Sequence, residues 1–207
     1  MPVEVAACTP SLCRWISYNL FCMLHNTERT WGAAAKSFHW LIAILILGQL
    51  GLGTIAEEAR VSPLKLELFV WHKSIGLTIL LLVILRVAWR LRNPPPLAPD
   101  GMATWEKRLA RVSHGLLYLL MIVVPLTGWW ISDTSRIPFR IYWSVPVPDL
   151  MAPNRDLMEF AASVHGVLTK FLLAIVVVHI LAAFRHHFLL QNDTLLRMLP
   201  FRQDPRS

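Results

Sequence analysis

In an apolar stretch in the last quarter of the chain, residues 161–188, His165 and His179 lie fourteen residues apart. Fourteen residues of α-helix make almost four whole turns, so both side chains leave the same face, roughly 21 Å apart along the axis. The hydrocarbon core of a bilayer is about 30 Å thick. A helix over this stretch therefore presents one imidazole near each membrane surface, which predicts a scaffold for two stacked cofactors.

The composition is that of a membrane protein. The 207 residues are 55% hydrophobic, residues 37–56 form a run of twenty without a formal charge, and residues 112–132 form a run of twenty-one. Each run is long enough to span a bilayer. We therefore predict an all-α, integral membrane four-helix bundle, with helices at about 35–56, 66–91, 105–131 and 161–188. The outer loop, 132–158, is aromatic and broken by prolines, which predicts a segment lying at the interface and not a fifth span.

The basic residues are distributed unevenly about these spans. If all four cross, thirteen Lys/Arg lie on the side of the N-terminal segment, middle loop and C-terminal tail and seven lie on the other side, while the acidic residues number six and seven respectively. The positive-inside rule then places the N and C termini in the cytoplasm. The net charge of +7 thus reflects topology, and we expect no nucleic-acid partner.

The segment before the first span is the least informative part of the chain. It has no basic region followed by a clean apolar core, so we predict no cleaved signal peptide. Cys8, Cys13 and Cys22 fit no zinc spacing and are interpreted as incidental thiols, and the absence of C-x-x-C-H excludes covalent haem attachment. We divide the chain into a cytoplasmic extension at 1–34, of which 1–22 need not belong to the working protein, a transmembrane domain at 35–200 and a cytoplasmic tail at 201–207.

By depth, the histidines in the spans sort into two layers. The outer layer holds His72 and His165, whereas the inner layer holds His39, His114 and His179. The outer layer has one pairing, but His179 can pair with either of the other two inner histidines, and spacing alone does not choose. Iron porphyrin is a large apolar disc that fits between helices, and imidazoles on both axial positions leave no open site. We therefore predict two b-type haems suited to electron transfer.

Two cations lie near these layers. Arg86 follows His72 by fourteen residues, and its guanidinium needs a partner inside a span, either an inner haem propionate or headgroups reached by snorkelling. Lys73 is interpreted as surface-solvated or as a site that steers an anion towards the outer haem. Gly76 and Gly166 leave room either for a porphyrin edge or for helix packing.

Several short motifs together resemble the bacterial cytochrome b561 family over about residues 35–200. They are Phe38-His-Trp, His72-Lys-Ser-Ile-Gly, Val164-His-Gly, Val178-His-Ile and the tail His186-His-Phe-Leu-Leu-Gln-Asn-Asp-Thr-Leu-Leu-Arg-Met-Leu-Pro. The resemblance implies a di-haem, multi-pass protein of the bacterial inner (plasma) membrane. It implies His39 with His179 as iron ligands of the inner haem, His72 with His165 for the outer haem, and a non-ligand role for His114. The N-terminal extension departs from the family's short leader.

The function that the resemblance implies is electron transfer linked to quinone. Our leading hypothesis is an oxidoreductase in which superoxide, or another one-electron donor, is oxidised at the periplasmic face near Lys73 and ubiquinone or another quinone is reduced in the lipid membrane. Gln49 is a polar candidate for the quinone pocket, although we favour a packing role. The alternative is a haem b electron-transfer subunit that links a partner redox enzyme, such as a hydrogenase, to the quinone pool. A haem-free, histidine-lined metal or proton transporter fits less well, because its polar groups should gather near mid-membrane.

Overall fold

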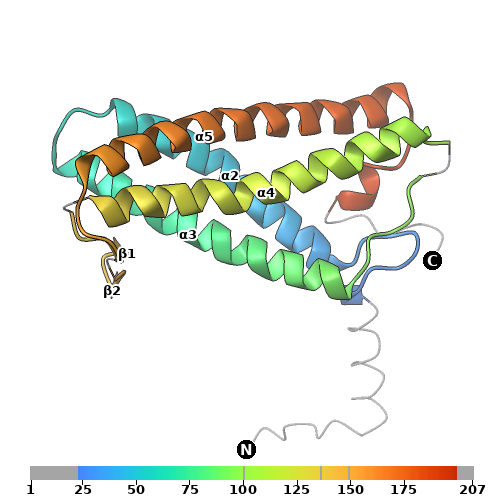
Figure 1. Cartoon of the computed structure of the whole chain (residues 1–207). Helices are drawn as coiled ribbons and strands as arrows, with labels where there is room; N and C mark the ends of the chain where they lie inside the picture. Colours follow the sequence, from blue (N-terminus) through green and yellow to red (C-terminus); the bar gives the residue numbers. More distant parts are fainter. Residues whose placement is uncertain (1–22, 100, 136, 149, 200–207) are drawn as a thin grey trace, which may run out of the picture.

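Four long helices run side by side in the computed structural model (Figure 1). The structure describes residues 23–99, 101–135, 137–148 and 150–199. Each long helix is apolar and long enough to cross a membrane, so the prediction of an all-α, four-helix membrane bundle is confirmed. They are α2 (Ala33–Glu58), α3 (Pro63–Arg92), α4 (Thr104–Thr134) and α5 (Arg155–Phe184). The expectations for residues 1–22, with their three cysteines, and for residues 201–207 lie outside the described residues.

The helix ends follow from local sequence. Ser62 begins α3 by accepting a hydrogen bond from the backbone N–H of Lys65 at 3.4 Å, with Pro63 at the first helical position, where its missing amide costs nothing. Asn154 caps α5 in the same way, accepting from the N–H of Leu157 at 3.1 Å. With this cap α5 begins at Arg155, six residues before the predicted start at 161. The prediction counted only the apolar run and left out the polar residues of the first helical turns.

A cluster of buried apolar side chains lies in the middle of the bundle, between the two histidine layers. Its members are Ile42, Ile46, Ile79, Val83, Leu117, Leu120, Met121, Val124 and Leu172. Large apolar residues also cover the outside, as with Ile44 at 66% and Val167 at 64% exposed. An aqueous bundle would place polar residues there, so this surface faces lipid. Without a hydrophobic difference between core and lipid, the helices associate chiefly through close packing.

A short β-hairpin covers the outer end. Strands β1 (Arg140–Ile141) and β2 (Val145–Pro146) pair antiparallel. Tyr142 at the turn fastens the hairpin to α3: its N–H donates to Ser74 Oγ at 2.9 Å, and its hydroxyl lies 2.9 Å from that of Thr78. Trp71 packs edge-on against the turn's Tyr142 and Trp143. The outer loop therefore adds no fifth span, as predicted, but its hairpin was not predicted.

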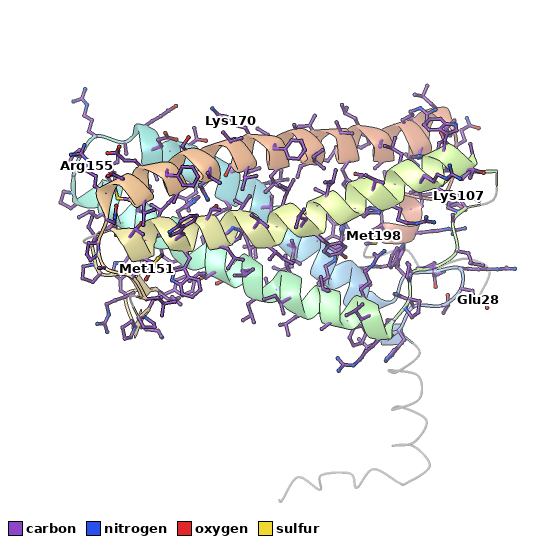
Figure 2. The ribbon with its side chains drawn as sticks, viewed as in Figure 1. Glu28, Lys107, Met151, Arg155, Lys170 and Met198 are labelled. Carbon is purple, nitrogen blue, oxygen red and sulfur yellow. The ribbon has the colours of Figure 1, made fainter. Side chains whose placement is uncertain are left out.

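The opposite end gathers both ends of the described chain and the α3–α4 connection (Figure 1). Glu28, Lys107 and Met198 lie at this end, whereas Met151 and Arg155 lie at the hairpin end (Figure 2). After α5 the chain continues through a π-helical turn, η1 (Arg185–Leu189), and a 3₁₀ turn, η2 (Leu196–Met198). It folds back onto α2, where the indole N–H of Trp40 donates to Met198 O at 2.8 Å. An even number of spans puts both ends on one side, as the charge distribution predicts.

Candidate functional site

The outer layer brings two histidines from different helices close together. His72 lies on α3 and His165 on α5, and their ring centroids are 6.3 Å apart with the ring planes at 80°. Both rings lie inside the bundle and are only partly accessible. The structure thus brings together the two residues that the sequence placed at this depth.

The inner layer contains three histidines. The ring of His179 on α5 lies 6.3 Å from that of His39 on α2 and 5.3 Å from that of His114 on α4. The separation of His39 from His179 equals that of the outer pair, whereas His114 lies closer. His39 and His114, the two possible partners of His179 in the sequence analysis, therefore differ in their distance from its ring.

The ring separations can be compared with the requirement of a shared metal. A metal–imidazole bond is about 2.0–2.1 Å long, and each ring centre lies ~1.1 Å behind its nitrogen, so two rings on opposite sides of one iron stand about 6.2 Å apart. The 6.3 Å separations of both layers fit this span. The 5.3 Å between His114 and His179 is too short for it, which favours His39 as the inner partner.

The donor set also fits iron porphyrin. In the described part of the chain no group of three or more His, Cys, Asp or Glu residues is placed to hold a metal ion. A bare zinc site needs at least three protein ligands, whereas a porphyrin supplies four nitrogens itself and asks the protein only for axial ligands. Pairs of facing imidazoles in an apolar bundle match the second requirement.

Two glycines that sequence reasoning missed lie against the outer histidine rings. A Cβ at Gly53 on α2 would stand 2.8 Å from Cε1 of His72, and one at Gly128 on α4 would stand 3.3 Å from Cε1 of His165. Real Cβ contacts this short would displace the rings. Of the two glycines singled out from the sequence, Gly76 lies beside Gln49, and a Cβ added at Gly166 would meet nothing within 4 Å.

The signal that would have found these glycines is a register shared by all four helices. Each helix repeats a functional position after fourteen residues, once at each depth. The pairs are His39 and Gly53, His72 and Arg86, His114 and Gly128, and His165 and His179. Each outer histidine therefore lies against a glycine on the neighbouring helix.

Arg86 points into the bundle and does not reach for headgroups. Its Nη2 lies 3.3 Å from Nδ1 of His39, and its guanidinium, like that of Arg90, lies over the ring of Tyr118, at 5.5 and 5.7 Å. No carboxylate of the described residues pairs with either arginine. Both line a small hollow with Trp89, at the depth of the inner pair, where acidic groups of a cofactor would find partners.

The contact with Arg86 constrains His39. A guanidinium only donates hydrogen bonds, so Nδ1 of His39 accepts here and the ring proton lies on Nε2. If Nε2 of His39 held a haem iron, the ring proton would lie on Nδ1 and would oppose the arginine. Arg86 would then need another partner, which a haem propionate would supply.

Lys73 is half-buried beside His72. Its ammonium lies 5.4 Å from the ring centre of Phe139, and Phe139 is only 6% exposed. The hairpin segment thus covers part of this cation. Gln49 donates its side-chain N–H to the carbonyl of His72 at 2.5 Å, so the described contact of Gln49 is a structural one between α2 and α3.

Comparison with known proteins identifies the family. The model of prokaryotic cytochrome b561 matches residues 30–201. The chain belongs to this family. It is 32% identical over 178 residues to "Cytochrome b561 homolog 2" of Escherichia coli (strain K12), covering 84% of this chain and 93% of that protein. It is 31% identical over 169 residues to "Probable superoxide oxidase CybB" of Yersinia pestis, covering 78% and 91%.

A more distant relative is "Cytochrome b562" of Cereibacter sphaeroides, 25% identical over 169 residues and covering 79% of this chain and 90% of that protein. As a member of the cytochrome b561 family with four spans, the chain is a multi-pass electron-transfer protein of the bacterial inner membrane. Membership also implies binding of haem b. The resemblance drawn from the histidine motifs and the tail is confirmed.

Replacing Gly53 with alanine tests the close approach to His72. The added methyl would meet Cε1 at 2.8 Å, so the ring must shift, at a cost of about 1–3 kcal/mol for overpacking. We expect Gly53→Ala to lower the haem content and the thermal stability of the purified protein, measured by the pyridine haemochromogen spectrum and by thermal unfolding.

Gly51→Ala in the same helix is the matched control, because nothing lies within 4 Å of its added methyl. Alanine is the better helix former by up to ~1 kcal/mol, so this variant should keep its haem and its stability. Equal behaviour of the two variants would contradict the close packing of α2 against His72.

Proposed function

We propose that this protein is a di-haem oxidoreductase that takes single electrons from superoxide at the periplasmic face and delivers them to a membrane quinone. In this proposal His72 and His165 hold the outer iron, and His39 and His179 hold the inner iron. Arg86 binds a propionate of the inner haem, and His114 lies beside His179 without ligating. The chain acts by placing two carriers in line across the bilayer.

The observation that carries the proposal is the repetition of one geometry at two depths. Each pair of rings has the same 6.3 Å separation, and α5 contributes one ring to each pair, His165 and His179. The fourteen residues between them set the two layers about 21 Å apart along the helix. A cluster of buried apolar side chains packs between the layers.

A haem iron held between two imidazoles alternates between ferric and ferrous and so passes one electron at a time. Two superoxide anions each give up one electron and leave as dioxygen. One quinone takes up the two electrons and two protons and becomes the quinol. The name of the Yersinia relative, "Probable superoxide oxidase CybB", supports superoxide as the donor.

Lys73 supplies positive charge where the donor approaches. It is next to the outer ligand His72 in sequence, and no carboxylate of the described residues pairs with it. A cation that lies partly out of water attracts an anion more strongly than one in bulk solvent. A small anion such as superoxide can exploit this charge, whereas the cover of Phe139 limits access by larger groups.

Reduction by superoxide is the direct test. We expect the oxidised, purified protein in detergent to show reduced haem α-bands on mixing with a superoxide source, because the outer haem accepts the electron. Addition of a ubiquinone should then reoxidise the haems. The measurement is stopped-flow absorbance, with superoxide dismutase added first as the control that removes the donor.

Absence of reduction at neutral pH in protein that holds both haems would contradict superoxide as the donor. In that case, co-purification of a partner redox chain that reduces the haems would favour the electron-transfer subunit. Protein that stays colourless when supplied with haem would contradict every form of the proposal.

The ligand assignment predicts that each haem can be lost without the other. His72→Ala should remove the outer haem and His179→Ala the inner one, because each variant deletes one axial ligand. Each variant should therefore fall from two haems to about one per chain, and redox titration should show the loss of a different component in each. His186→Ala, which changes a histidine beyond α5, should keep both haems. Loss of the same component in both variants would contradict the assignment.

Removal of the charge at Lys73 should slow the reaction with superoxide. We expect Lys73→Ala to lower the second-order rate by roughly two- to tenfold at low salt, through lost electrostatic attraction. The difference should shrink as ionic strength rises, because salt screens the charge. The measurement is the rate of haem reduction as a function of salt concentration.

Arg155→Ala controls for the overall charge of the outer face, since it removes one positive charge from a side chain that is 86% exposed. This variant should react at the wild-type rate. A rate for Lys73→Ala that equals the wild-type rate at every salt concentration would exclude a steering role for Lys73.

A further inference from the structure

The outer ligand His165 has a hydrogen-bond partner on the helix beside it. Thr127 of α4 is 8% exposed, and its Oγ1 lies 2.9 Å from Nδ1 of His165. The same hydroxyl donates to the carbonyl of Val124 at 2.7 Å, and Nδ1 of His165 lies 3.1 Å from that carbonyl. One imidazole nitrogen thus faces two oxygens.

The arrangement of protons follows from these contacts. The carbonyl of Val124 only accepts, so the Thr127 hydroxyl gives its hydrogen to that oxygen and keeps a lone pair for His165. Nδ1 of His165 must then carry a proton and donate it to one or both oxygens. The tautomer is fixed with Nε2 unprotonated, which is the form that binds iron.

The other outer ligand has no such support. Nδ1 of His72 is buried and makes no hydrogen bond within the described residues. Gly53 lies against its ring, which fixes the position of the imidazole by packing alone. The two imidazoles of the outer pair are therefore unequal, and only His165 is held by hydrogen bonds.

We propose that Thr127 is a positioning residue that, together with the Val124 carbonyl, fixes the tautomer of His165, and that its hydroxyl lowers the midpoint potential of the outer haem. The inference rests on the proposed ligand set. A hydrogen bond accepted from the distal nitrogen of a ligating imidazole increases the basicity of the nitrogen on the metal. A more basic ligand stabilises the ferric iron more than the ferrous iron, because the ferric ion carries more charge.

The test is a redox titration of the full-length protein with both haems bound. Thr127→Val keeps the shape of the side chain and removes the nearer of the two oxygens beside Nδ1 of His165, leaving the Val124 carbonyl at 3.1 Å. Changing a hydrogen-bond partner of a metal ligand typically alters metal binding by about 10–100-fold. We expect the midpoint of the outer component, the one that His72→Ala removes, to rise by about 59 mV. This value corresponds to a tenfold weaker binding of the ferric haem with binding of the ferrous haem unchanged.

Two variants serve as controls. Thr127→Ser keeps the hydroxyl and should restore the wild-type midpoint. Thr54→Val removes a hydroxyl from α2 that bonds only to the carbonyl of Leu50, at 3.0 Å, and it should leave both midpoints unchanged. The inner component should not move in any of the three variants.

The possible outcomes separate this inference from the proposed function. Thr127→Val could also lose the outer haem while Thr127→Ser and Thr54→Val keep both haems. That result would support the positioning role, just as a raised midpoint would. An outer midpoint that is unchanged in Thr127→Val, or raised equally in Thr127→Ser, would overturn it while leaving the two-haem assignment intact. If valine prevents folding, Thr127→Ala removes the same oxygen without adding bulk and is titrated instead. A wild-type protein that lacks a second haem would overturn the ligand set itself.

Discussion

A polar side chain inside a bilayer must find a partner within the protein, since lipid offers none. This constraint organises the whole bundle. The five histidines of the spans and Arg86 lie at two depths inside the bundle, and the core cluster packed between those depths is apolar. The ring centroids of His39 and His179, and those of His72 and His165, lie 6.3 Å apart with steeply inclined ring planes. Imidazoles held in pairs at this separation inside an apolar bundle suit the haem b binding that the family implies.

The architecture was predictable because each membrane span requires a long run of apolar residues, which is visible in the sequence. The uncharged runs at 37–56 and 112–132 gave two spans directly, and the bias of Lys and Arg gave the orientation. The depth of each histidine in the membrane could also be predicted, because each residue of a helix advances 1.5 Å along its axis. The direction in which each helix turns its side chains relative to the other helices could not be predicted. His39 and His114 share one depth, and only the packing of α2 and α4 around α5 gives their rings different distances from His179.

The same limit explains the parts of the site that the sequence did not reveal. Gly53 and Gly128 are important because of the ring that each one faces, and those rings belong to other helices. Thr127 is one threonine among several until His165 is placed beside it at 2.9 Å. The hairpin was missed for a different reason. Its strands are two residues each, too short for an alternating pattern, and it is held by the contacts of Tyr142 with α3.

The cover at the outer end bears on which donors the protein can use. Electron transfer to a protein partner needs a docking face from which the haem edge is close. Here the segment before β1 lies over the charged end of α3, with Phe139 buried and near Lys73. The hairpin is hydrogen-bonded to Ser74, which is fully buried two residues after His72. A cation under an aromatic cover is reached more readily by a diatomic anion than by a folded domain. The cover of Phe139 over Lys73 thus fits the small anionic donor of our proposal.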